Sequence, residues 1–125
     1  MHKQIIAAIF AAFIAVPAIV QAADTLPTKT VEQVFGEQAQ LSGKHIHISG
    51  KVVKVNNGIM GKNFLHIQDG TGTEGSNDIT VTSQQTAKVG DMLDIEALVT
   101  TNRDFGMGYS YAVILEDAKL SPASH

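Results

Sequence analysis

Cysteine is absent from this sequence of 125 residues. The chain therefore forms no disulfide, offers no thiolate ligand to a metal and has no point for the covalent attachment of c-type haem. We expect no haem in this chain, so any haem that it works with belongs to a partner protein. The absence of cysteine does not exclude export, because a disulfide is optional in a compartment such as a bacterial periplasm.

The sequence also lacks the short motifs that mark common catalytic sites. It has no Gly-x-Ser-x-Gly elbow, no phosphate-binding glycine loop, no His-Glu-x-x-His and no cysteine nucleophile. Serine, histidine and aspartate occur, but no arrangement orders them into nucleophile, base and acid. We therefore expect a protein that binds a ligand and is not an enzyme.

Positive charge is scarce, with 9 Lys and Arg against 12 Asp and Glu and a net charge of −3 with histidine neutral. A mildly acidic domain is a poor general binder of polyanions, so a nucleic-acid partner is not expected. The charge is uneven, however, because residues 44–68 contain four lysines and no acid. One side of the domain can attract an anion, although a solvated, lysine-bearing strand is the simpler interpretation.

A long apolar run occurs only at the N-terminus. Lys3 precedes an apolar run at residues 5–14, and Val20-Gln21-Ala22 provides small residues for cleavage before Ala23. The run is short for a membrane span, which needs about 20 apolar residues, so a retained anchor is the lesser alternative. We predict a signal peptide at residues 1–22, a periplasmic mature protein without a membrane span, and about 100 remaining residues that suffice for one domain.

The mature chain starts with a predicted linker and a short helix. Residues 23–29 form the linker, and Thr30 with Gln33 has the form of a capping box. Val34, Phe35 and Leu41 then lie at helical spacing. Because a helix this short is unstable alone, we expect it to dock these side chains on an open end of the following sheet.

Alternation of apolar and polar residues predicts five strands, with a domain at residues 30–120 and a flexible tail at 121–125. The strands are expected at residues 44–56, 63–69, 78–82, 92–100 and 109–117. The first is long, and its pattern slips at Val52-Val53 next to Gly50, which indicates a bulge or bend. The pattern predicts a mainly β fold, a five-stranded antiparallel OB-fold barrel with a short N-terminal helix, and an SH3-like barrel is the alternative. In an OB barrel the loops after strands 1 and 4 lie at the same end, which would bring residues 58–61 near residues 105–108.

The sequence resembles exported bacterial OB-fold proteins, and most closely the small NrfJ-related periplasmic proteins associated with multihaem cytochromes. The stretches that carry the resemblance are residues 50–56, 58–66, 68–72, 78–82 and 89–91, Asp104-Phe105-Gly106 and Gly108-Tyr109. It implies an accessory protein, a carrier of copper, that serves a periplasmic respiratory cytochrome. The sequence departs from the expected pattern at Phe64, where a tryptophan is expected, and at Met107, where a smaller residue is expected.

Met60, His66 and Met107 form the first candidate site. Soft thioethers together with an imidazole suit Cu(I), and methionines on loops flanked by glycine have little reason to serve the core. Methionine is also an ordinary filler of gaps in cores, so simple packing is the alternative.

His45 and His47 form a second candidate metal pair. They lie at i and i+2 on a predicted strand, so both rings point the same way, with α-carbons about 7 Å apart. Such a pair can chelate Cu(II) or Zn(II), with His125 as a further ligand. Two solvated histidines on a polar face are the alternative.

Phe64, Lys62, Tyr109 and Tyr111 are candidate ligand-binding residues, because OB-folds often stack bases or sugar rings on aromatic side chains. Core and rim packing is the alternative for these rings. Two functions follow: a non-enzymatic, periplasmic, copper-binding accessory protein for respiratory multihaem cytochromes, or an OB-fold module that binds an oligonucleotide, oligosaccharide or protein partner across strands 2 and 3. A third interpretation is an adaptor that docks on a cytochrome.

Overall fold

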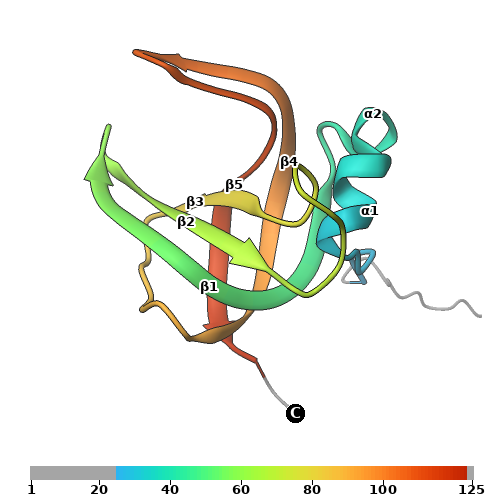
Figure 1. Cartoon of the computed structure of the whole chain (residues 1–125), viewed down its shortest axis with the longest axis horizontal. Coiled ribbons are helices and arrows are strands. Elements are labelled where there is room, and N and C mark those ends of the chain that lie inside the picture. Colours follow the sequence, from blue (N-terminus) through green and yellow to red (C-terminus); the bar gives the residue numbers. More distant parts are fainter. Residues whose placement is uncertain (1–24, 124–125) are drawn as a thin grey trace, which may run out of the picture.

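Five strands make up most of residues 25–123, the part of the chain that the computed structural model describes (Figure 1). The strands are β1 (His45–Ile59), β2 (Lys62–Gln68), β3 (Ile79–Ser83), β4 (Met92–Gly106) and β5 (Tyr109–Pro122). They close into one ring in the order β1-β2-β3-β5-β4. The prediction of a mainly β fold with five strands is confirmed.

The sheet is mixed, and the prediction of a purely antiparallel barrel is wrong. β3 and β5 run parallel, with Val81 opposite Leu115, whereas the other four neighbouring pairs are antiparallel. The reason is geometric. Strand direction can alternate around a closed ring only when the number of strands is even, so a ring of five strands must contain a parallel pair.

The β4–β5 hairpin and the C-terminal end of β5 are longer than the sequence pattern predicts. β4 continues to Gly106 and β5 begins at Tyr109, so most of the segment 101–108, which lies between the predicted fourth and fifth strands, is itself strand. β5 also continues to Pro122, opposite Leu93, so the predicted tail at 121–125 begins with strand residues. The β1–β2 and β4–β5 hairpins both project from the same side of the ring (Figure 1).

The predicted bend in β1 is present. The pairing of β1 with β2 shifts register between Val52 and Lys54. Next to this shift, the backbone of Gly50 lies so close to β2 that an added Cβ atom would stand 2.5 Å from Ile67 Cγ2 and 2.9 Å from the Gln68 carbonyl oxygen. Only glycine allows this close approach, which lets one strand pair with β4 along its first half and with β2 along its second.

The core fills the ring with aliphatic side chains from all five strands. Alternate residues of each strand point inward, as the two-residue period requires. The fully buried members include Ile46, Ile48, Val52, Leu65, Ile67, Ile79, Val81, Ile95, Ala97, Val99 and Leu115.

Two short helices, α1 (Val31–Gly36) and α2 (Gln38–Leu41), contribute Val31, Val34 and Leu41 to the core, as expected of a docked helix. The Thr30 side chain accepts from the Gln33 backbone N–H, and the Gln33 side chain accepts from the Thr30 N–H, so the predicted capping box is confirmed. A carboxylate outside the helix adds a further contact, because Asp69 Oδ2 accepts from the Val31 N–H at 2.9 Å.

The residues before α1 belong partly to the sheet. Thr28 forms a parallel bridge with His47, the Lys29 N–H donates to the His47 carbonyl, and the His47 N–H donates to the Pro27 carbonyl. The end of the predicted linker is therefore held in place. The predicted signal peptide lies outside the described residues. Within residues 25–123, no helix has the length and apolar character needed to cross a membrane.

Candidate functional site

A methionine lies at the tip of each projecting hairpin. Met60-Gly61 joins β1 to β2, and Met107-Gly108 joins β4 to β5. All four residues have positive φ, at 53°, 79°, 56° and 87° in chain order. Positive φ at both central residues is the signature of a type I′ turn, whose first position normally holds asparagine, aspartate or glycine. Each methionine therefore adopts a conformation that costs about 1–2 kcal/mol for a residue with a side chain.

Neither methionine is buried. Met107 is 93% exposed and Met60 is 45% exposed. The alternative that these residues fill gaps in the core therefore does not describe Met107, and it describes Met60 only in part. Both thioethers are accessible to a ligand from solvent.

Four aromatic rings pack together between the two hairpins. The ring of Phe64 on β2 lies 5.6 Å from Phe105, 6.1 Å from Tyr109 and 6.5 Å from Tyr111, measured between centroids. Phe105 and Tyr111 add a contact at 6.1 Å. Only 2% of Phe64 is exposed, so this ring is the centre of the cluster. The cluster joins one hairpin to the other.

Two cations lie against the ring of Phe105. The Arg103 guanidinium is 4.2 Å and the Lys62 ammonium is 5.7 Å from its centroid. Arg103 Nε also contacts Glu116 Oε2 at 3.1 Å. The negative face of an aromatic ring attracts such cations, so these contacts strengthen the packing between the two hairpins.

The two hairpins that this aromatic cluster links carry their methionine-bearing tips at the same end of the molecule (Figure 1). Lys62 and Phe105 are in contact, and each is two residues from the methionine of its own hairpin. The structure thus brings together the two glycine-rich segments that the sequence predicts to share one end.

His66 lies elsewhere on β2. It lies four positions beyond Lys62, or about 13 Å along an extended strand, so its imidazole does not join the methionines at the tips. Its Nδ1 atom instead contacts Asp78 Oδ1 at 2.9 Å, and the Gln68 amide donates to Asp78 Oδ2 at 3.0 Å. An ionised carboxylate only accepts, so it favours the tautomer with the proton on Nδ1.

His45 and His47 lie at the start of β1, at the opposite end of that strand from Met60. They share one face as predicted, with His47 half-buried opposite Glu96 of β4 and His45 exposed. Within residues 25–123, no three or more histidine, aspartate or glutamate residues are grouped so as to hold a metal ion. His125 lies outside the described residues.

The candidate ligand-binding aromatics are not an open platform. Phe64 is covered by the β4–β5 hairpin, while Tyr109 is 37% exposed at the edge of the cluster. Burial raises the pKa of Tyr111 above its ordinary value, and the neighbouring Tyr109 raises this pKa further. Arg103 is not among the residues predicted for this site, because the strand pattern ends at residue 100 and resumes at residue 109. The sequence signal that could have identified it is the i, i+2 spacing of Arg103 and Phe105, which places two residues on one face of a strand.

No protein-family model matches this sequence, and no curated protein matches it. Among solved structures, the chain is similar to the crystal structure of a "putative aspartyl-tRNA synthetase" from Leishmania major Friedlin, with a TM-score of 0.54 and 13% sequence identity. The likeness covers 86% of this chain but 23% of the other, so the chain spans about a quarter of that protein's length. At this identity the likeness concerns the fold alone, and it supports a β-rich, OB-like fold.

Proposed function

We propose that this protein is a non-enzymatic OB-fold binding module that holds one Cu(I) ion between its two hairpin tips, through the sulfur atoms of Met60 and Met107. The strand order and the closed ring of five strands support the OB assignment. Thioethers are soft ligands, which favour Cu(I) over hard cations. His66, the third residue of the predicted site, is left out of the ligand set because of its distance along β2.

The observation that carries the proposal is the backbone conformation of the two methionines. Each occupies the first position of a turn that favours asparagine or glycine, and each exposes an apolar side chain to solvent. A residue held in this region against its preference suggests a function for its side chain. The aromatic cluster below the tips supports the proposal further, because it links the two hairpins.

Two thioethers leave the coordination of Cu(I) incomplete. Because Met107 is almost fully exposed, a ligand from a second protein can reach the ion and complete its coordination. Such an open site suits a carrier that delivers copper by exchange of ligands. In line with the resemblance to NrfJ-related proteins, we propose delivery to a periplasmic respiratory cytochrome after export through the signal peptide.

An anaerobic competition titration with a chromogenic Cu(I) chelator tests the site. We expect one Cu(I) per chain, and we expect Met60→Leu and Met107→Leu each to weaken binding at least about tenfold, or about 1.4 kcal/mol. Met92→Leu is the matched control, since Met92 is 49% exposed but begins β4 away from the tips. Unchanged affinity in both tip variants, or equal loss in the Met92 variant, would contradict the proposal.

The second function, binding of an oligonucleotide, oligosaccharide or protein across strands β2 and β3, is less well supported. Stacking on that face needs an open aromatic ring, and the ring of Phe64 is already covered by the chain's own β4–β5 hairpin. Tyr109 remains the most accessible ring of the cluster.

A further inference from the structure

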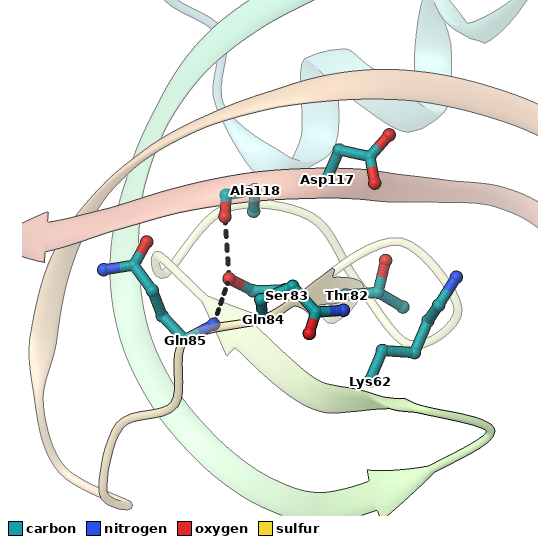
Figure 2. A pocket seen from close by; sticks show the side chains of 7 residues that line it. All are labelled: Lys62, Thr82, Ser83, Gln84, Gln85, Asp117 and Ala118. Carbon is teal, nitrogen blue, oxygen red and sulfur yellow. Dashed lines mark hydrogen bonds between the residues drawn. The ribbon is translucent and has the colours of Figure 1, made fainter.

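A separate pocket of about 200 Å³ lies beside β5, at the ends of β2 and β3 (Figure 2). Lys62 at the start of β2 and Asp117 on β5 stand on its two sides, and Thr82 of β3 lies between them (Figure 2). Its volume is that of roughly six or seven liquid water molecules, enough for a small polar ligand. None of the residues that line it is aromatic.

Thr82 provides the first indication of a ligand. Its side chain is part of the pocket wall, only 2% of the residue is exposed, and within residues 25–123 its hydroxyl has no hydrogen-bond partner. In Figure 2 the hydroxyl oxygen points into the space between Lys62 and Asp117. Buried hydroxyl groups are normally paired, because an unpaired one costs about 1–3 kcal/mol. A bound ligand would supply the missing partner.

The conformation of Asp117 provides the second indication. Asp117 has a φ of 54° and lies in a β-bulge, where Asp117 and Ala118 stand opposite the single residue Ala97 of β4. A bulge redirects a side chain, and here it turns a carboxylate toward the pocket. Ser83 holds the bulge against β3, because its hydroxyl donates to the Ala118 carbonyl at 2.7 Å and accepts from the Gln85 N–H at 3.0 Å (Figure 2).

The charges of the pocket define the class of ligand. Lys62 and Asp117 carry opposite charges, and within the described residues they form no ion pair with each other or with another side chain. A simple anion would be repelled by Asp117 and a metal cation by Lys62. A sugar is less suited, because no aromatic ring is present for it to stack on. A ligand that carries both charges satisfies both sides.

We propose that this pocket binds a small zwitterion of the α-amino acid class, whose carboxylate pairs with Lys62, whose ammonium group pairs with Asp117 and whose polar atoms satisfy the Thr82 hydroxyl. The pocket contains neither methionine, although it shares Lys62 with the cation–π contact to Phe105 that links the two hairpins. Because both charged groups are partly solvated, the affinity is modest, with a dissociation constant of about 1 mM.

Titration of the isotope-labelled protein with glycine and L-alanine, followed by NMR, tests the pocket. We expect saturable shifts of the backbone amides at residues 82–85 and 118. N-acetylglycine lacks the cation and glycinamide lacks the carboxylate, so both are expected to bind at least about tenfold more weakly. D-glucose is the control ligand, because it is a polyol without charge. No saturable shift up to about 50 mM amino acid, or an equal response to N-acetylglycine or glucose, would overturn the proposal.

Three variants link the shifts to the named groups. Asp117→Asn keeps a residue that tolerates positive φ and should weaken glycine binding about tenfold, as should Lys62→Gln. Glu74→Gln, an exposed acid on the β2–β3 connection, is the control and should bind glycine normally. Thr82→Val should weaken binding while leaving the free energy of unfolding equal or higher, because its hydroxyl has no partner in the described chain. Normal glycine binding in both charge variants contradicts the proposal, as does a loss of stability in Thr82→Val.

Discussion

Phe64 and Phe105 pack edge to face, with ring centroids 5.6 Å apart and an angle of 73° between the rings, although they belong to different hairpins. Aromatic pairs of this geometry contribute about 0.5–1.5 kcal/mol beyond the burial of their surface. The contact therefore does more than fill space. It links the β1–β2 hairpin to the β4–β5 hairpin.

Phe64→Ala should lower the free energy of unfolding by about 3–5 kcal/mol, because it removes a buried ring that contacts three others. Phe105→Ala should have a smaller effect, since this ring is only half-buried. Urea denaturation measures both values. We also expect both variants to weaken Cu(I) binding although neither alters a ligand. A loss below about 1 kcal/mol for Phe64→Ala would show that the cluster is not a structural joint.

Gly50→Ala should destabilise the protein by about 1–3 kcal/mol or more, because the new methyl group would stand 2.5 Å from Ile67 Cγ2 and 2.9 Å from the Gln68 carbonyl oxygen. One of these neighbours is backbone, which has little freedom to move. Gly36→Ala is the control. Nothing lies within 4 Å of a Cβ atom at Gly36, at the end of α1, so this change should be neutral or stabilising. Equal thermal midpoints for the two variants would contradict the prediction.

The core and the approximate strand positions could be predicted from the sequence, because the two-residue period reflects burial directly. Ile46 and Ile48, for example, alternate with His45 and His47 as expected. The ends of β4 and β5 could not be predicted in this way. Beyond Thr100 the β4–β5 hairpin leaves the ring, so Arg103 is held by pairing with Tyr111 and not by an inward-facing apolar side chain. A pattern that depends on burial fails where a strand is no longer part of the barrel wall.

A closed ring of five strands was enough to predict one parallel pair, and the strand order places that pair at β3 and β5 because the other four neighbouring pairs are antiparallel. The position of the candidate site depends on contacts between residues that are far apart in the sequence. Met60 and Met107 could be placed at one end from the fold class, but the covering of Phe64 by Phe105 depends on the curvature of two hairpins. Thr82 and Asp117 gave no sequence signal, because a β-bulge and an unpaired hydroxyl are tertiary features.

Asp69→Ala should lower the free energy of unfolding by about 2 kcal/mol. The carboxylate accepts from the Val31 N–H through Oδ2, and from the Thr71 N–H and hydroxyl through Oδ1. Its removal leaves the first turn of α1 without this partner and frees the loop after β2. Thr30→Ala, which removes the N-cap of the same helix, should cost about 1 kcal/mol. Glu74→Ala on the same connection is the control, and the same loss in that variant would contradict a specific role for Asp69.

Tyr111 should make the stability of the protein depend on pH in the alkaline range. Burial removes water from its phenolate form, and Tyr109 adds repulsion, so its pKa in the folded state lies above the ordinary value of 10.0. A raised folded-state pKa means that the contribution to stability is fully present below pH 10.0 and is lost as the pH rises through the folded-state pKa.

We therefore expect the free energy of unfolding to fall above pH 10.0, and to fall less steeply in Tyr111→Phe, with the ionisation of lysine common to both proteins. Urea denaturation at a series of pH values measures the difference. In Tyr109→Phe the remaining tyrosine should still titrate above pH 10.0 by tyrosinate absorbance, because burial is the larger cause of the shift. Parallel stability curves for the wild type and Tyr111→Phe would show that the ring is equally solvated in the folded and unfolded chains.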